Sequence, residues 1–319
     1  MMPHVQPLTI VMYHYIRDFT RTRYPGIKGL DLAGFRRQLD YLQSRHTIVR
    51  VRDVVAAQRG ESSLPADAAL LTFDDAYAEH YALVFPELYE RKLEGAFFAP
   101  VDPVCHGKLL DVNRIHFILA ANAAQGGDPA VISAQLDAAL REAQAEWKLE
   151  TVEAYRAQWA HSSRFDDAET IYIKRMLQTA LPEALRHRIA ADLFSHFVSV
   201  DEKAFAGELY MSEQQARLMQ SCGMYFGSHG ASHHWLNHVP RETQEAEVDR
   251  SLAFLRRIGS PVDDHWVMCY PYGGWNEGLL DVLRSRNCTL GLTTEVSTAE
   301  IGRHDPLLLP RFDTNDFPR

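Results

Sequence analysis

Two adjacent aspartates, Asp74 and Asp75, follow an apolar run at residues 70–73 that has the length and composition of a buried strand. Neighbouring carboxylates repel each other and raise each other's proton affinity, so such a pair needs a cation or a shared proton. Buried strands of α/β sheets and barrels present chemical groups at their C-terminal ends. The pair therefore predicts a functional site, although a carboxylate here could also simply cap the helix that follows.

A second polar group, residues 227–234, contains three histidines directly after another predicted strand. His229 and His233 are four residues apart, so on a helical turn both imidazoles would face one ion. Neutral imidazole is the commonest metal ligand among side chains. We therefore predict that His229 and His233 bind a metal, with a purely structural role for the histidines as the alternative.

One carboxylate and two imidazoles provide three ligands and leave one coordination position open, as catalytic zinc sites do. The other aspartate, left off the metal, could then accept a proton from the attacking water. The same set of ligands also describes non-haem iron oxygenases. Hydrolysis is favoured here, because the pattern of the chain is α/β and the additional carboxylate suits a general base.

The two polar groups are far apart in the sequence and can meet only if parallel strands place them at one edge of a sheet. Strands alternate with helical patterns over the first hundred residues and again after residue 207, which predicts parallel pairing. The predicted strands are 8–13, 47–51, 70–73, 95–100, 224–226, 266–270, 289–293 and 307–309. Seven or eight strands are enough to close a small barrel.

The stretch between these parts shows helical periodicity and almost no strand signal. We therefore predict three segments: residues 1–110 as the first part of a barrel, 111–207 as a helical insertion, and 208–319 as the second part of the barrel. Two roles remain open for the insertion, a lid over the site and an oligomer face.

Composition narrows the class of protein. The chain has 319 residues, of which 46% are hydrophobic, and a net charge of −9, which argues against nucleic acid or an anionic membrane surface as the main partner. Its 4 cysteines are widely spaced, which fits a reducing compartment. No signal peptide is recognisable, and the apolar run at 8–12 is too short to span a bilayer. We expect a soluble, cytoplasmic protein whose oligomeric state is open.

With these motifs the chain resembles the polysaccharide deacetylases, also called NodB-homology or carbohydrate esterase family 4 enzymes. Residues 72–75 (TFDD) are similar to a family motif whose first aspartate is the base and whose second is a metal ligand. Residues 229–233 resemble its HxxxH metal motif, and residues 270–273 (YPYG) resemble its groove motif, whose tyrosine N–H helps to form the oxyanion hole. The resemblance covers residues 7–105 and 208–311 and leaves the insertion largely unaccounted for.

The resemblance implies a deformed (β/α)7 barrel of the α/β class and metal-dependent removal of N-acetyl groups from amino sugars. The implied substrate is an acetylated amino sugar in an oligosaccharide, a polysaccharide or a linked precursor. Asp74 would be the base and Tyr272 would supply the oxyanion-hole N–H. The ligands of a divalent ion, with zinc expected, would be Asp75, His229 and His233.

The chain departs from the family's pattern at three places. Ala76 replaces the glycine after TFDD, Cys269 stands where the groove arginine is usual, and no C-terminal leucine-plus-histidine motif supplies the usual general acid. Three rival functions therefore remain open: a deformylase-type amide hydrolase acting on a modified sugar, a non-catalytic sugar-binding relative, and the iron oxygenase. Trp235 and Trp275 follow the site motifs and could either stack on a sugar ring or pack in the barrel.

Two residues are predicted to replace the missing groups. His14 follows the first strand, on the same C-terminal edge as Asp74, so we predict it as the general acid in preference to His304, which precedes the last predicted strand. Arg311 follows that strand and could pair with Asp74. A packed strand-end histidine and an ordinary surface arginine are the respective alternatives.

Overall fold

The computed structural model describes residues 5–162 and 166–318. The chain folds into two compact units. The first comprises the chain up to Arg17, Gly29–Lys108 and the chain from Ala206 onward, and the second comprises Asp18–Lys28 and Leu109–Phe205. The division into residues 1–110, 111–207 and 208–319 remains a prediction. Residues 18–28, which lie inside the first of these segments, group with the helical unit.

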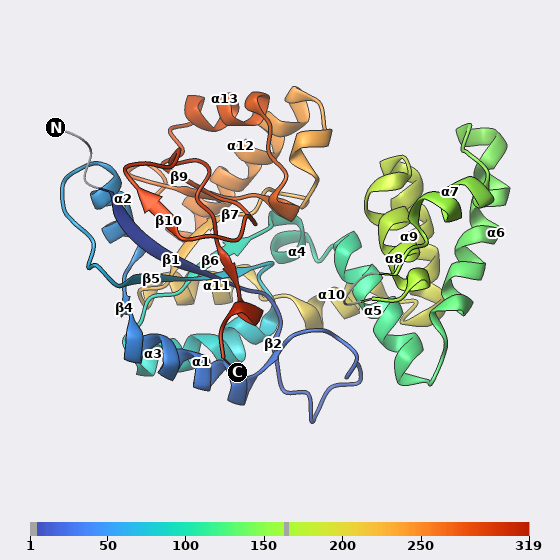
Figure 1. Cartoon of the computed structure of the whole chain (residues 1–319), viewed down its shortest axis with the longest axis horizontal. Coiled ribbons are helices and arrows are strands. Elements are labelled where there is room, and N and C mark those ends of the chain that lie inside the picture. Colours follow the sequence, from blue (N-terminus) through green and yellow to red (C-terminus); the bar gives the residue numbers. More distant parts are fainter. Residues whose placement is uncertain (1–4, 163–165, 319) are drawn as a thin grey trace. The chain divides into compact units, whose positions relative to one another are not determined.

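The first unit is an α/β structure built on a curled, mostly parallel sheet (Figure 1). The strand order is β10-β1-β5-β6-β7-β8-β9, with β4 pairing β5 and β11 pairing β1. Only β10 runs antiparallel to its neighbour among these described strands. This arrangement confirms the predicted deformed barrel. The strands are β1 Gln6–Tyr13, β4 Thr47–Ile48, β5 Ala68–Asp74, β6 Ala96–Ala99, β7 Tyr225–Ser228, β8 Val267–Cys269, β9 Leu290–Leu292, β10 Ala299–Ile301 and β11 Phe312–Asp313; the pair β2 Ile16–Arg17 and β3 Leu30–Asp31 is separate.

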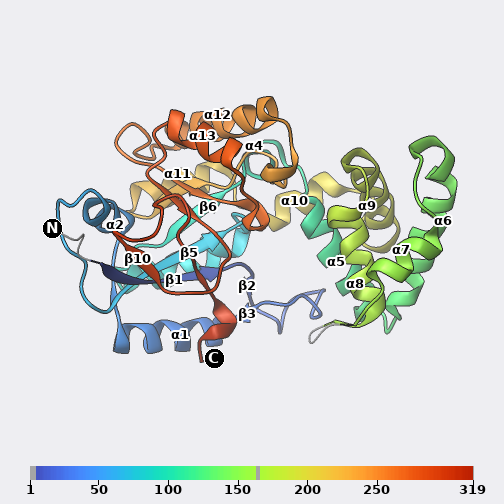
Figure 2. The same cartoon turned by 45° about the horizontal axis from the view of Figure 1, so that its top comes forward.

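Helices cover the sheet of the first unit on two sides, with α12 and α13 on one side and α1 on another (Figures 1 and 2), and α3 lies beside α1 (Figure 1). Side-chain caps define several of their starts; in α13, for example, Asn276 accepts the N–H of Leu279. The helices are α1 Leu32–Arg45, α2 Val51–Gln58, α3 Phe85–Glu90, α4 Val101–His106, α11 Glu213–Ser221, α12 Arg241–Ile258 and α13 Glu277–Ser285, and a π-helical turn, His80–Val84, precedes α3.

Successive residues of the parallel strands belong alternately to two apolar clusters, because side chains alternate between the faces of a strand. In β5, Phe73 packs in the cluster that contains helix residues such as Leu252, whereas Leu70 packs with strand residues such as Phe98. The side chain of Asp74 lies on the same face of β5 as that of Leu70. All of β5 is buried, which explains why its sequence is a continuous apolar run.

Two predicted strands differ from the structure. The predicted final strand at 307–309 is wrong: Leu309 makes only an isolated bridge with Leu292, and the strands on either side of it are β10 and β11. The predicted strand at 47–51 ends at Ile48, because Val51 begins α2 and its N–H donates to the Glu94 carboxylate at 2.8 Å.

The second unit is helical, with no strand among its described residues. Tyr24 explains why residues 18–28 belong to it, since the ring packs edge-on against Phe117 at 5.0 Å and Phe205 at 5.9 Å. No helix in the described ranges is long and apolar enough to cross a membrane. The helices are α5 Asp111–Ala124, α6 Pro129–Trp147, α7 Val152–Trp159, α8 Ala168–Arg175, the π-helical turn Met176–Ala180, α9 Glu183–Phe197 and α10 Glu202–Leu209, which continues into the first unit.

Phe97→Ala is expected to lower the free energy of unfolding by about 3–5 kcal/mol, because a buried ring is replaced by a cavity. Phe97 in β6 stacks with Phe73 at 4.8 Å and with Phe226 at 5.5 Å between ring centroids. Urea unfolding followed by circular dichroism measures the loss. The control Val296→Ala changes a side chain that is 60% exposed and should alter stability by less than about 0.5 kcal/mol. Equal effects of the two variants would contradict the prediction.

Candidate active site

The predicted site residues lie at one edge of the sheet. His14 follows β1, Asp74 ends β5, and His229 follows β7. These strands belong to one parallel run, β1-β5-β6-β7-β8, so their C-terminal ends lie together. The topology therefore brings together groups from three distant parts of the sequence, as predicted.

Asp75 leaves the strand in a conformation that redirects its carboxylate. Asp74 still pairs with Phe98 in the ladder, but Asp75 and Ala76 have φ angles of 74° and 54°, which residues with side chains rarely adopt. Asp75 Oδ1 lies 3.3 Å from His229 Nε2 and 3.4 Å from His233 Nε2. All three side chains are buried, and their ligand atoms lie within 4.8 Å of one another. Three ligand atoms in this arrangement could hold a metal ion.

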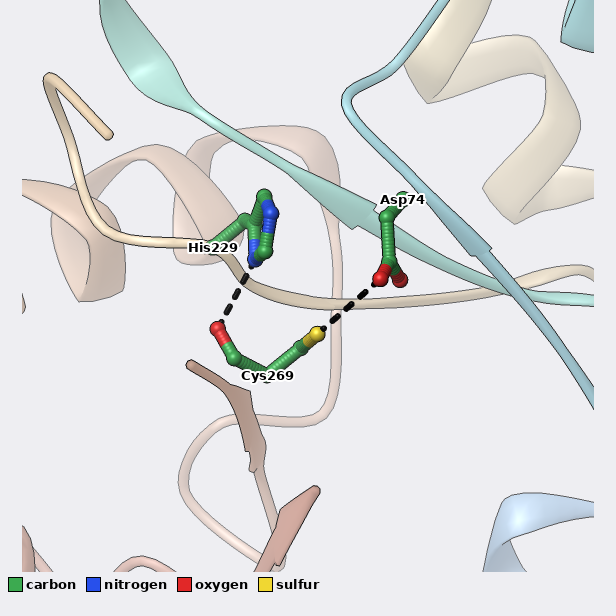
Figure 3. Close-up of side chains that lie close together, drawn as sticks. All are labelled: Asp74, His229 and Cys269. Atoms are coloured by element: carbon green, nitrogen blue, oxygen red, sulfur yellow. Dashed lines mark hydrogen bonds between the residues drawn. The ribbon is translucent and has the colours of Figure 1, made fainter. Parts of the chain in front are cut away.

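His229 and His233 converge from a loop, and the predicted helical turn is wrong. Residues 229–233 are not helical, and the chain curls instead through positive φ angles of 70° at Gly230 and 60° at His233. His229 Nδ1 donates a hydrogen bond to the Cys269 carbonyl at 2.8 Å (Figure 3). Because a carbonyl oxygen only accepts, Nδ1 carries a proton, and in the neutral ring Nε2 then has the lone pair for a ligand bond.

The chemistry of the three groups fits a divalent ion. Asp75 Oδ1 is buried and accepts no hydrogen bond from any residue in the described ranges. A buried carboxylate oxygen without a partner is costly, and a cation would satisfy it. Ligand atoms around a tetrahedral zinc with bonds of about 2.0–2.1 Å lie about 3.3–3.4 Å apart. The measured separations from Asp75 Oδ1 agree with this spacing.

Tyr77 fixes the orientation of Asp75. Its hydroxyl donates to Asp75 Oδ2 at 2.7 Å, and its buried ring stacks on Tyr15 with centroids 4.2 Å apart. One carboxylate oxygen is thereby occupied and the other faces the imidazoles. No pattern in the sequence singles out Tyr77 for this role, because its hydrogen bond depends on how the chain turns after β5.

Asp74 has a separate set of partners. The Arg311 guanidinium pairs with both of its oxygens, Nη1 with Oδ1 and Nη2 with Oδ2, each at 3.0 Å. The Cys269 thiol donates to Asp74 Oδ2 at 3.4 Å (Figure 3). Burial raises the pKa of Asp74, and the charge of the Arg311 guanidinium, the largest opposing influence, helps to bring it below its usual value. Asp74 is therefore ionised and able to accept a proton.

Arg311 is buried, at 1% exposure, so the alternative of a surface arginine is wrong. It lies between the Leu309 bridge and β11, not at the exit of a regular strand as expected. Its Nε donates to the Thr293 carbonyl at 2.9 Å and its Nη1 to Thr72 Oγ1 at 3.2 Å. These bonds hold the guanidinium in register with the carboxylate of Asp74.

His14 and His304 lie at opposite ends of β1. His14 Nε2 is 3.8 Å from Asp74 Oδ2, and its side chain is 40% exposed. It can thus reach both the site and solvent, as a group that exchanges protons must. His304 Nδ1 accepts the N–H of Glu300 in β10, the strand that pairs with the N-terminal end of β1. Of these two histidines, His14 is the one that lies near Asp74.

The groove motif forms a turn after β8. Tyr272 has a φ of 58°, and its ring meets the edge of His233 at 4.6 Å. Trp235 stacks with Tyr272 at 4.5 Å and with His238 at 5.6 Å, which favours packing over sugar contact for this residue. Trp275 is 37% exposed. The role of the Tyr272 N–H in an oxyanion hole remains a prediction.

Solved proteins with this fold include several deacetylases. The deacetylase PplD of Streptococcus pyogenes, solved in complex with acetate, has a TM-score of 0.55 at 14% identity over 98% of this chain and 92% of its own. The BpsB deacetylase domain of Bordetella bronchiseptica gives 0.55 at 14% over 96% and 95%. BC0361 of Bacillus cereus, a polysaccharide deacetylase, gives 0.55 at 14% over 97% and 65%. No curated protein matches the chain.

The structural likeness at these identities shows the fold alone, an α/β half-barrel. The family model described as polysaccharide deacetylase matches residues 162–291, which include His229, His233 and Tyr272 but neither Asp74 nor Asp75. Taken together, the partial match to the family model and the shared fold confirm the predicted resemblance to the polysaccharide deacetylases.

Tyr77→Phe is expected to weaken the binding of a divalent metal ion about 10- to 100-fold, because loss of the hydroxyl frees the Asp75 carboxylate to rotate. Competition with a chromophoric chelator measures the affinity. Tyr81→Phe removes the same chemical group from the following π-helical turn and serves as the control. Wild-type affinity in Tyr77→Phe would show that the hydrogen bond does not orient the ligand.

Proposed function

We propose that this protein is a metal-dependent hydrolase that removes an N-acetyl group from an amino sugar of a saccharide or its precursor, in cell-surface polysaccharide metabolism. The observation that carries the proposal is the convergence of two imidazole nitrogens on the buried, unpartnered Oδ1 of Asp75, beside a second carboxylate that stays outside the set of ligands. The family implies an acetylated polysaccharide as the class of substrate.

Asp75, His229 and His233 would hold the ion, with zinc expected from two nitrogen ligands and one oxygen. Bound there, a divalent ion would supply Lewis-acid activation of an amide carbonyl and of water. The second carboxylate, which stays outside the set of ligands, supports hydrolysis over the iron oxygenase alternative.

Asp74 is suited to accept a proton from the attacking water. It is buried and ionised, and Arg311 holds both of its oxygens, so its position and its charge are fixed. His14 is assigned the proton donor for the leaving amine, because it lies beside Asp74 and is partly exposed. The backbone N–H of Tyr272 is assigned to the oxyanion that forms during attack.

Asp74→Asn is expected to reduce acetate release from an N-acetylated amino-sugar oligosaccharide at least about 100-fold, because the amide cannot accept the proton. The variant should keep its bound metal, since Asp74 is not a ligand. Asp75→Asn and His229→Ala should lose both metal and turnover. Enzymatic acetate detection and elemental analysis of the same preparations provide the two measurements.

Loss of metal from Asp74→Asn would refute the separation of base and ligand. Each of the three rival functions predicts another outcome. Release of formate from a formylated sugar, without acetate from the acetylated one, would indicate a deformylase. Sugar binding without release of either acid would indicate a binding protein, and bound iron with consumption of a 2-oxo acid would indicate an oxygenase.

Arg311→Gln is expected to move the acidic limb of the pH profile of kcat/KM to higher pH. Burial raises the pKa of Asp74 and the Arg311 charge lowers it. Without the guanidinium the pKa of Asp74 rises, so the base is protonated, and activity lost, at a higher pH as the pH falls. Arg303→Gln, at a side chain that is 68% exposed, is the control. An unchanged limb in Arg311→Gln would show that Arg311 does not tune the base.

A further inference from the structure

The loop between the two histidine ligands is held by a buried carboxylate. Glu247 in α12 is 3% exposed, and its Oε2 accepts the backbone N–H groups of Ala231 and Ser232, each at 2.8 Å. One oxygen atom thereby fixes the backbone midway between His229 and His233.

Asp102 in α4 and Arg250 in α12 complete the support. The Asp102 N–H donates to the Ala231 carbonyl at 2.8 Å, and Asp102 Oδ2 accepts the Ser232 hydroxyl at 3.1 Å. Arg250 pairs with Asp102 Oδ1, donates to Ser232 Oγ at 3.2 Å and lies 3.5 Å from Glu247 Oε1. Both backbone groups of Ala231 are therefore used, and a guanidinium compensates the two buried acids.

Gly230 allows the loop to approach Glu247 this closely. Its φ of +70° lies in the left-handed region, and a Cβ at this position would come within 3.1 Å of Glu247 Oε2. A side chain here would strain the backbone and press on the carboxylate. Because residue 230 has no side chain, the loop can lie close enough for the Glu247 carboxylate to reach its backbone.

We propose that Glu247 is a positioning residue for the metal centre: its carboxylate sets the loop so that the Nε2 atoms of His229 and His233 already face Asp75 before an ion binds. The proposal rests on the metal site of the proposed function. Preorganised ligands lose less conformational freedom on binding, so the support should appear as metal affinity. The length of the Glu247 side chain should decide how strongly the metal affinity changes, because both hydrogen bonds to Oε2 come from backbone N–H groups.

Two variants separate reach from charge. Glu247→Asp keeps the charge but is shorter by one methylene, so it cannot hold both N–H groups in place, whereas Glu247→Gln keeps the length and can present its amide oxygen to both. We expect zinc affinity to fall about 10-fold or more in Glu247→Asp and to stay within about 3-fold of wild type in Glu247→Gln. Chelator competition on the folded apoprotein measures affinity, and the visible spectrum of the cobalt(II)-loaded protein, altered only in Glu247→Asp, reports ligand geometry.

Leu252→Ala is the matched control, because Leu252 lies on the same helix, α12, and packs in the apolar core. It should lower Tm and leave zinc affinity unchanged. The positioning role is overturned if Glu247→Asp binds zinc like wild type or is weakened no more than Leu252→Ala. It is also overturned if Glu247→Gln loses as much affinity as Glu247→Asp, since charge would then be the cause.

Hydrogen exchange of the wild-type apoprotein tests the same proposal without a variant. The amides of Ala231 and Ser232 should be protected before metal is added, and protection that arises only with zinc would overturn the proposal. A wild-type protein that binds no zinc at all would refute the metal centre itself, and this inference with it, whereas a failure confined to Glu247 leaves the proposed function standing.

Discussion

Two like charges, those of Asp74 and Asp75, are buried side by side at the end of β5, and each needs its own compensation. Arg311 neutralises Asp74 through two parallel contacts. Asp75 receives only Tyr77 on one oxygen and turns the other toward two imidazoles. Because their partners differ, Asp74 is suited to act as an ionised base and Asp75 as a metal ligand. The remainder of the first unit can be understood as the support for that separation.

The sheet supplies the first part of this support. β5 lies between β1 and β6 and is buried along its whole length, so the position of Asp74 is set by rigid neighbours. The turns after the strands supply the second part. Four of the seven non-glycine residues with positive φ in the described ranges lie at the site: Asp75, Ala76, His233 and Tyr272. Such conformations cost about 1–3 kcal/mol each and persist only where surrounding contacts impose them, as the bonds from Glu247 and Tyr77 do.

Sequence reasoning succeeded where the signal was local. The apolar run before Asp74 predicted a buried strand, and the alternation of strands and helices predicted that His14, Asp74 and His229 would reach one edge. It failed where a conformation is imposed from outside. A spacing of four suggested a helical turn for His229 and His233, but Gly230 and the buried Glu247 hold a non-helical loop instead. The run at 307–309 has strand composition and still forms only one bridge.

By itself, the amino-acid sequence determined the class of fold, the resemblance to one family and the types of residue that could bind a metal, because apolar periodicity and short motifs are properties of neighbouring residues. Only the tertiary structure decided which atoms meet. Arg311 reaches Asp74 across 237 positions of the chain, and Tyr77 and Glu247 act through single hydrogen bonds to a carboxylate or a backbone N–H. Such contacts depend on the path of the folded backbone, to within the length of a hydrogen bond, and no local pattern encodes them.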